Sequence, residues 1–141
     1  MAQSDVDVVR DQFAAVNERD FPRAMGHYAD DVVLVIETDF PSSGTFEGKE
    51  AVGRWFGDWL GAFATDYRFE ITDARDLGDG LVYLHARYGG SGRASGAWAQ
   101  AESAYLYRVE GGKIRRVQLF LTPDEALEAA SLPEWSNSKT D

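Results

Sequence analysis

The spacing of apolar residues changes several times along the first third of the chain, and each change predicts a different element. Apolar residues first recur every three or four positions after the cap residue Ser4, which predicts a helix from about Asp5 that buries Val6, Val9, Phe13 and Val16. Asp20 is predicted to cap a second short helix that buries Phe21, Met25 and Tyr28. The β-branched run VVLVIET at 32–38 predicts a strand, and the Pro-, Ser- and Gly-containing stretch at 39–48 predicts a loop.

Alternating runs dominate the second half of the chain. A third helix is predicted to begin after Gly48 and to end near Phe63. Strands are predicted at 67–77, 81–88, 98–109 and 113–121, separated by turns or links rich in Gly and Asp. Thr122 is predicted to cap a last helix with Pro123 in its first turn, and residues 133–141 are expected to be frayed.

These elements together indicate an α+β fold. The antiparallel strands need a cover for their one apolar face, and the N-terminal helices are the segments available for it. We therefore expect a cone-shaped, strongly curved, mixed or antiparallel sheet wrapped around those helices, with a conical space between them. No internal repeat or linker is evident, so residues 1–141 are predicted to form a single domain with its core at about 6–132.

The charge balance narrows the possible partners. The chain has 24 acidic and 14 basic residues, a formal net charge of −10, which disfavours nucleic acid and anionic membrane surfaces. It has no cysteine, no basic and apolar regions typical of a secretory signal, and no apolar stretch near the ~20 residues that span a bilayer. Two histidines without metal-ligand spacing predict no metal site. We therefore expect a cytoplasmic protein without a cofactor.

Large aromatic side chains are concentrated on the third predicted helix. On a helical wheel they form one apolar arc of about 100°, which contains Val52, Trp55, Phe56, Trp59 and Phe63. The other side carries Gly53, Gly57 and Gly61, each of which costs about 1 kcal/mol relative to alanine. Two compatible interpretations follow: an aromatic core with closely packed glycines, or a cavity wall formed by Trp55 and Trp59.

Three segments carry a resemblance that covers the chain from about Val6 to Leu132: FAAVN to HYADDV (13–32), FEGKEAV to WL (46–60) and EGGKIRRV to LTPDEALEAA (110–130). They resemble the nuclear transport factor 2-like superfamily, and within it the SnoaL-like group, which includes polyketide cyclases and is akin to ketosteroid isomerases. The resemblance implies an α+β cone with a pocket, often dimerising through the outer face of the sheet. It implies no single activity, because this fold hosts enzymes, binding modules and transport adaptors.

The resemblance allows the ketosteroid isomerase positions to be compared one by one. Gln12 stands where those enzymes have a hydrogen-bonding tyrosine, and Ile36 stands where they have the catalytic aspartate. Their second oxyanion donor falls on Ala104 or Tyr105. Because an isoleucine cannot move a proton, steroid isomerisation by that mechanism is not expected.

Strand alternation assigns side chains to the two faces of the sheet, if the resemblance fixes the register. The inward set is mostly apolar or phenolic: Val82, Leu84, Ala86, Tyr88, Ser103, Tyr105, Tyr107, Val117, Leu119 and Leu121. The outward set carries the charges: Tyr83, His85, Arg87, Gln100, Glu102, Arg116 and Gln118. His85 is therefore interpreted as a surface or interface residue paired across strands. Tyr83, His85, Gln118 and the outward Phe120 predict a homodimer through the outer sheet face.

Three side chains are candidates for proton transfer. Glu37 or Asp39 could replace the missing base only if a bulge turned one of them inward. His27 lies near the end of the second predicted helix, where the helix dipole explains a histidine and an acid–base role is the alternative. The glycine-rich segment at 89–96 resembles a phosphate loop in composition but lies between strands, so it is interpreted as a hairpin end or bulge.

We therefore predict a pocket that binds a small hydrophobic molecule and is lined by Gln12, Phe13, Tyr28, Trp55, Trp59, Tyr88, Tyr105 and Tyr107. Two functions stay open at this point. One is a cofactor-independent acid–base enzyme of the isomerase, cyclase or hydrolase type, acting on a small hydrophobic or ring compound. The other is a non-catalytic ligand-binding or accessory domain.

Overall fold

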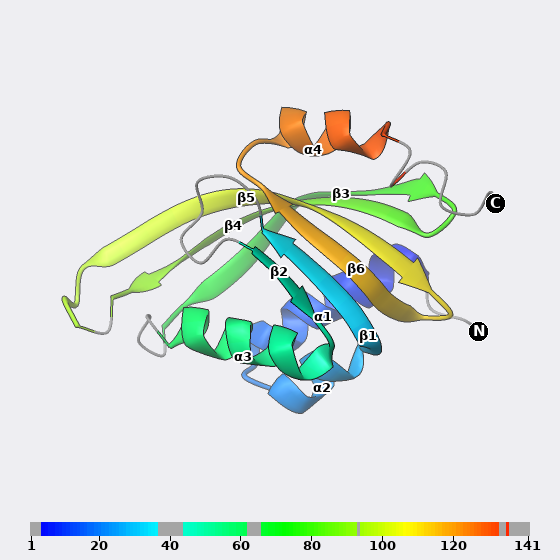
Figure 1. Cartoon of the computed structure of the whole chain (residues 1–141). Coiled ribbons are helices and arrows are strands. Elements are labelled where there is room, and N and C mark those ends of the chain that lie inside the picture. The colour runs from blue at the N-terminus through cyan, green and yellow to red at the C-terminus, as the bar shows by residue number, and fades with distance from the viewer. Residues whose placement is uncertain (1–3, 37–43, 62–65, 93, 133–134, 136–141) are drawn as a thin grey trace.

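The computed structural model describes residues 4–36, 44–61, 66–92, 94–132 and 135, with the backbone alone at Trp59 and Ala99. Its elements, labelled in Figure 1, are α1 (Asp5–Asn17), α2 (Phe21–Gly26), β1 (Tyr28–Ile36), β2 (Gly44–Glu47), α3 (Lys49–Leu60), β3 (Arg68–Gly78), β4 (Leu81–Ser91), β5 (Trp98–Glu110), β6 (Lys113–Phe120) and α4 (Pro123–Ala130). Among these residues, no helix is both long enough and apolar enough to cross a membrane.

The strands form one open, mixed sheet in the order β2-β1-β6-β5-β4-β3. β1 pairs with β6 in parallel, and every other neighbouring pair is antiparallel. The sheet curves around α1 and α3, whereas α4 lies on its opposite side (Figure 1). This arrangement confirms the predicted α+β fold, with a curved mixed sheet wrapped around the N-terminal helices.

Three helices begin at the caps that the sequence predicts. Ser4 Oγ accepts a hydrogen bond from a backbone N–H in the first turn of α1 at 3.1 Å. The Asp20 carboxylate accepts one from α2 at 3.3 Å, and Thr122 Oγ1 accepts one from α4 at 3.2 Å. Each bond satisfies a donor that the first turn of a helix cannot pair internally, which fixes where the helix starts.

The pairing of the strands confirms the predicted register of the sheet. Tyr105 on β5 pairs with Leu84 on β4 and with Leu119 on β6, so three inward side chains lie in a row. Arg87 and Glu102 also pair across β4 and β5, and both side chains are exposed on the outer face. Because successive side chains point to opposite faces of a sheet, one correctly assigned pair fixes the face of all the remaining residues in the two strands.

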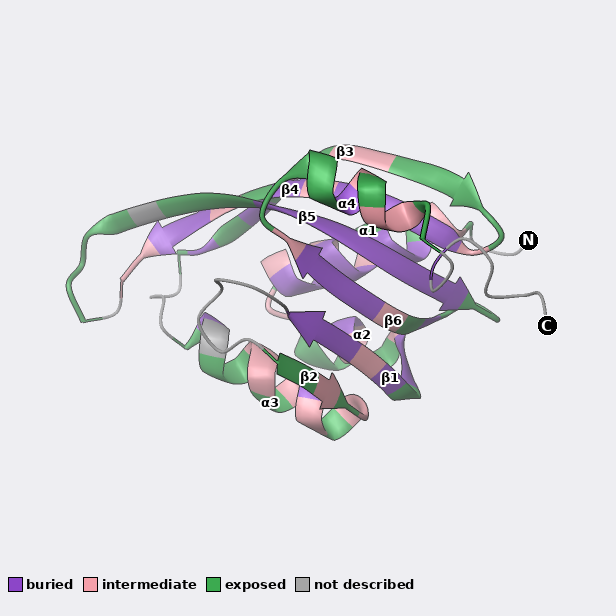
Figure 2. Cartoon of the chain, turned by 45° about the horizontal axis from the view of Figure 1, so that its top comes forward, coloured by how far each residue is buried: buried purple, intermediate pink, exposed green. Residues whose placement is uncertain are grey.

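β4 and β5 form a long hairpin that extends beyond the rest of the sheet (Figure 1). Its end is exposed (Figure 2), and Trp98 there is 59% exposed. The glycine-rich segment thus lies at a hairpin end, as predicted, and it opens no helix.

Four local predictions are wrong. Tyr28 begins β1 instead of lying on α2, and Phe21 is 42% exposed because the short α2 buries Ala24 instead. Leu121 follows the end of β6 and is also 42% exposed. Gly44–Glu47 forms a strand within the predicted loop, because its backbone pairs with the last four residues of β1. Tertiary pairing overrides the weak strand propensity of this segment.

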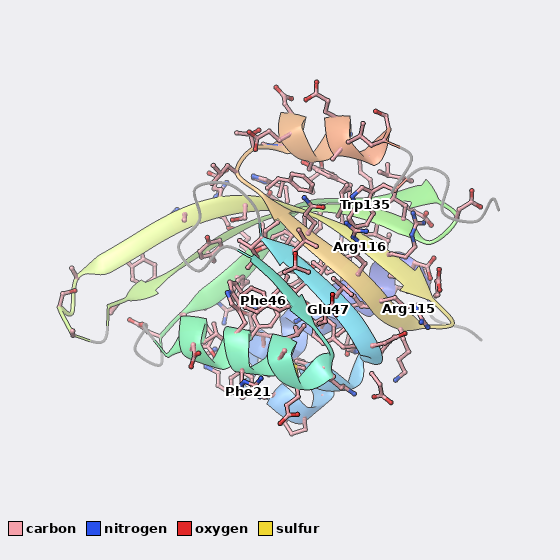
Figure 3. All side chains as sticks on the ribbon, viewed as in Figure 1. Phe21, Phe46, Glu47, Arg115, Arg116 and Trp135 are labelled. Carbon is pink, nitrogen blue, oxygen red and sulfur yellow. The ribbon has the colours of Figure 1, made fainter. Side chains whose placement is uncertain are left out.

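A second apolar cluster lies on the outer face of the sheet beneath α4. Trp135 is 1% exposed and packs with Tyr83 and Ala126. Figure 3 labels the position of its indole. The buried guanidinium of Arg108 donates a hydrogen bond to the Trp135 carbonyl. This part of the predicted frayed tail is therefore packed, because one large apolar ring finds a complementary surface on the sheet.

This cover bears on the predicted homodimer. Tyr83 and Gln118, two of the outward residues on which that prediction depends, are 2% and 4% exposed within the single chain. His85 and Phe120 are half-buried. The homodimer stays a prediction, and the surface open to it excludes the area that α4 and Trp135 cover.

Candidate functional site

A cavity of about 520 Å³ lies between the inner face of the sheet and the helices α1 and α3. Half of its lining side chains are aromatic. The lining consists of Gln12, Phe13 and Val16 on α1, Phe46 on β2, Ala51, Arg54, Trp55, Phe56, Asp58 and Leu60 on α3, and Phe69, Tyr88, Tyr105, Tyr107, Val117 and Leu119 on β3 to β6. Its size falls in the range of sites for small organic ligands, about 300–1,000 Å³.

The aromatic rings form a connected wall. On the α1 side, the Phe13 ring lies 5.5 Å from Phe69 and 5.6 Å from Tyr105, measured between centroids. On the α3 side, Trp55 and Phe56 meet edge to face, with centroids 5.0 Å apart and ring planes at 80°. Such pairs add about 0.5–1.5 kcal/mol each beyond the burial of their area, so this wall is held in place without a ligand.

Trp55 shows that the α3 aromatics are core and cavity wall at once. Its half-buried ring packs against Phe46, with centroids 6.3 Å apart, and also lines the cavity. Helical spacing turns Trp55 and Phe56 toward the sheet, and Gly57 then falls on the exposed side. The side chain of Trp59 lies outside the described residues, so its place in the wall stays a prediction.

The structure brings together most of the residues that the sequence predicts as ligand-binding. Tyr28 is the exception among those with described side chains: its buried ring lies 6.3 Å from the Phe56 centroid and does not line the cavity. It begins β1 and belongs to the core instead. The predicted residues that line the cavity are Gln12, Phe13, Trp55, Tyr88, Tyr105 and Tyr107.

Tyr105 and Tyr107 bring two phenols to the cavity from alternate positions of β5. They are 5% and 2% exposed, and their rings stack with centroids 5.9 Å apart. Burial raises the pKa of both phenols well above the ordinary value of about 10, and the nearby phenols of Tyr88 and Tyr28 raise that of Tyr105 further. The Tyr88 hydroxyl shares a hydrogen bond with Ser103 Oγ at 3.2 Å. Tyr105 and Tyr107 are therefore uncharged at neutral pH.

We expect Tyr28, Tyr105 and Tyr107 to stay un-ionised in alkali until the protein unfolds. Their pKa values in the folded state lie above the unfolded value of about 10, so the native protein keeps protons that the unfolded chain releases. The stability from this difference is complete below about pH 10 and is lost as the pH rises through the folded pKa values. Tyrosinate absorbance and circular dichroism, recorded together against pH, measure it. Ionisation of all tyrosines near pH 10 in a folded protein would contradict the expectation.

Gln12 is deeply buried, yet its amide has no hydrogen-bond partner among the described residues. It is 3% exposed and lines the cavity from α1. Asn17, on the same helix, shows the contrast: its amide donates to the Phe69 carbonyl at 2.9 Å and accepts from the Phe69 N–H at 2.8 Å. A buried amide without a partner costs about 1–3 kcal/mol, so Gln12 is a polar group left available to a ligand.

The charged lining residues lie on the solvent side of α3. The Arg54 side chain is 69% exposed, and its guanidinium lies 3.6 Å from the carboxylate of Glu50 one turn earlier. Asp58 is exposed as well. Exposed pairs of this kind contribute little to stability. The charges therefore stand at the edge of the cavity, and its buried described lining is neutral.

His27, a predicted catalytic candidate, lies outside the cavity lining. It caps the end of α2, and its Nε2 lies 2.7 Å from Asp11 Oδ2 on α1. Arg23 donates two further hydrogen bonds to the same carboxylate, at 3.1 and 3.0 Å. The bonds from Arg23 and then from His27 lower the pKa of Asp11. This cluster fastens α2 to α1, which explains His27 without a role in the cavity.

The other two catalytic candidates, Glu37 and Asp39, lie outside the described residues. β1 ends at Ile36, which is 1% exposed and pairs with Leu119 of the cavity wall. A core isoleucine at this position supplies no proton acceptor. In the described ranges, no group of three or more histidine, aspartate or glutamate side chains is arranged to hold a metal ion.

On the outer face of the sheet, His85 pairs across strands as predicted. Its Nε2 lies 3.2 Å from Glu102 Oε1 on β5, and its Nδ1 is hydrogen-bonded to the Thr72 hydroxyl on β3. These contacts use both ring nitrogens. His85 therefore serves the packing of three neighbouring strands and does not reach the cavity.

Sequence reasoning did not single out Phe46 and Phe69 as lining residues. Phe46 belongs to the short strand β2, whose segment predicts a loop, and Figure 3 shows it between β2 and α3. Phe69 pairs with Tyr88 across β3 and β4, so the alternation that turns Tyr88 inward also turns Phe69 inward. That signal was present in the sequence of β3, whereas the position of Phe46 depends on tertiary pairing.

The SnoaL-like domain family matches residues 9–117 of this chain, which include the cavity-lining parts of α1, α3 and β3 to β5. The chain belongs to the SnoaL-like domain family. Among curated proteins, no match to the chain was found.

Solved structures share the fold over nearly the whole chain. An NTF2-like protein from Burkholderia thailandensis is 25% identical, with a TM-score of 0.74 over 93% of this chain and 100% of that one. A hypothetical protein with a ketosteroid isomerase-like fold from Catenulispora acidiphila, in complex with trimethylamine, is 23% identical, with a TM-score of 0.70 over 90% and 94%. TerC, co-crystallised with polyporic acid, is 16% identical, with a TM-score of 0.71 over 88% and 95%. The predicted relationship to the nuclear transport factor 2-like superfamily is confirmed.

Proposed function

We propose that this protein binds a small, mostly apolar ring compound in the cavity between α1, α3 and the sheet. The observation that carries the proposal is the lining: aromatic rings surround a space of about 520 Å³, into which a few uncharged polar groups project. Small-molecule sites are typically concave and mostly apolar, with a small number of polar groups that orient the ligand.

A solid aromatic core explains the polar groups less well. Tyr107 and Gln12 are 2% and 3% exposed, and neither side chain forms a hydrogen bond with another described residue. In a dry core each of these groups would destabilise the protein by about 1–3 kcal/mol. A cavity that holds water or a ligand supplies the missing partners.

Two of the similar structures support a small organic ligand in this fold. TerC was co-crystallised with polyporic acid, and the Catenulispora acidiphila protein was solved in complex with trimethylamine. These molecules were found with those proteins. The 520 Å³ cavity of the present chain suits a ring compound better than it suits trimethylamine, because trimethylamine would leave most of the aromatic wall uncovered.

Binding is proposed rather than catalysis, because the described lining contains no buried carboxylate or imidazole, and burial raises the pKa of its phenols Tyr105 and Tyr107. Asp58 is exposed on α3, and His27 is held by Asp11 outside the lining. Glu37 and Asp39 lie outside the described residues. The ligand-binding alternative is thus the function that the site supports best.

We expect the substitution Ala51→Trp to weaken binding by about tenfold or more, since Ala51 is half-buried and lines the cavity, and a tryptophan ring would fill space that the ligand needs. A thermal-shift screen of ring compounds identifies ligands of the wild type, and calorimetry then gives their dissociation constants. Ala97→Trp, at the exposed end of the β4–β5 hairpin, is the matched control and should bind as the wild type does. The proposal fails if the wild type takes up no compound, or if Ala51→Trp binds equally well while folded.

A further inference from the structure

Resting on the proposed function, we propose that the ligand is a neutral ring compound carrying a hydroxyl or carbonyl group, and that this group pairs with the side-chain amide of Gln12. The inference concerns the chemical class that the cavity selects. The burial of Gln12 and the absence of a buried charge from the described cavity lining carry this proposal.

The amide of Gln12 is an unpartnered polar group aimed into a largely apolar space. It is 3% exposed, it lines the cavity, and it forms no hydrogen bond with any described residue. Gln12 lies among the buried residues of α1 and contributes to the cavity lining. Since an amide offers both a donor and an acceptor, it can pair with a ligand hydroxyl or with a ligand carbonyl.

The described part of the cavity lining disfavours a charged ligand group at Gln12. The other polar side chains of the described buried lining are the phenols of Tyr105 and Tyr107, which stay protonated because burial raises the pKa of each. The cation of Arg54 is at the solvent edge with Glu50, and Asp58 is exposed. A carboxylate or ammonium brought to Gln12 would lose its hydration without gaining a counter-ion from the described lining.

Three probes of nearly equal size test this selection: naphthalene, 2-naphthol and 2-naphthoate. Near pH 7 the first has no polar group, the second has a neutral hydroxyl and the third has a charge. Titration of ¹⁵N-labelled protein followed by two-dimensional NMR gives each dissociation constant. It also reports on the Gln12 side-chain NH₂ signals, which Gln12→Leu identifies by their absence. We expect these signals to shift with 2-naphthol and 2-naphthoate to bind about tenfold more weakly than 2-naphthol.

The variant Gln12→Leu keeps the size of the side chain and removes the amide. We expect the preference for 2-naphthol over naphthalene to fall about tenfold in this variant. Gln118→Leu is the matched control. Gln118 is 4% exposed, and its amide oxygen has no hydrogen-bond partner among the described residues, but it lies on the outer face of the sheet. It should leave all three constants unchanged.

The outcomes separate the two proposals. If the three probes bind equally, if 2-naphthoate binds best, or if the Gln12 signals stay still when 2-naphthol binds, the inference about Gln12 is overturned and the cavity remains a binding site. If none of the probes and no compound of the screen binds the folded wild type, the proposed function is overturned together with the inference. The shift of the Gln12 signals is measured in the wild type, and triple-resonance assignment of the wild type identifies these signals if Gln12→Leu does not fold.

Discussion

Replacing Trp135 with alanine is expected to lower the free energy of unfolding by about 3–5 kcal/mol. The indole is 1% exposed and fills the space between α4 and the outer face of the sheet, beside Tyr83 and Leu106. The guanidinium of Arg116 lies over its ring, 4.8 Å from the centroid. Truncation would leave a large cavity and remove this cation–π contact. Urea unfolding followed by circular dichroism measures the change.

The matched control for Trp135 is Trp98→Ala, since Trp98 is 59% exposed at the end of the β4–β5 hairpin and should cost little. A loss below about 1 kcal/mol for Trp135→Ala would show that the C-terminal segment does not pack on the sheet. Ligand affinity should be unchanged in both variants, because neither tryptophan lines the cavity.

Trp55→Ala is expected to affect ligand binding more than stability, unlike Trp135→Ala. The free energy of unfolding should fall by about 1–3 kcal/mol, and the affinity for a ring compound should fall about tenfold or more. Trp55 is half-buried, packs against Phe46 and Phe56, and also lines the cavity. Urea unfolding and calorimetric titration, carried out on the same variant, separate the two effects.

If Trp55→Ala loses the full 3–5 kcal/mol of a core tryptophan and still binds the ligand with wild-type affinity, Trp55 is core alone. Comparison with Trp135→Ala makes this decision possible within one protein. Each substitution removes a tryptophan side chain, one from the inner side of the sheet and the other from its outer side.

Much of the fold follows from the pattern of residues, because period-two alternation places alternate side chains on opposite faces of a sheet. Alternation, in the register that the resemblance implies, predicts Tyr105 and Tyr107 inward and Arg87 and Glu102 outward. The first two line the cavity and the other two are exposed, which confirms the prediction. The helix caps were also predictable, because a cap is a local hydrogen bond between residues close in sequence.

Features that depend on contacts distant in sequence were not predictable in this way. β2 exists because its backbone pairs with β1, and Trp135 is ordered because its ring matches a surface built from β4, β5 and α4. The partner of His27 is Asp11 on the preceding helix, and their contact depends on how α2 folds back onto α1. No local pattern indicates such a pair.

The residues of the candidate site also divide into those that local patterns predict and those whose place depends on contacts distant in sequence. The aromatic residues of α3 and the phenols of β5 were expected to share a cavity, because periodicity assigns each to an inward face. Phe46 was not predicted as a lining residue because it lies in β2, where the sequence predicts a loop. Tyr28 was wrongly assigned to the second helix, because the boundary between α2 and β1 falls before it. Gln12 is predicted only through the resemblance, and the structure was needed to show that its amide has no hydrogen-bond partner among the described residues.

The most direct test of ligand binding in the aromatic cavity is an isotope-filtered nuclear Overhauser spectrum of the labelled protein with bound 2-naphthol. We predict contacts from the naphthol ring protons to Phe13, Trp55 and Tyr105, which line the cavity from α1, α3 and β5. Contacts confined to exposed residues such as Trp98, or no contacts at a concentration that saturates the protein, would contradict the proposed function.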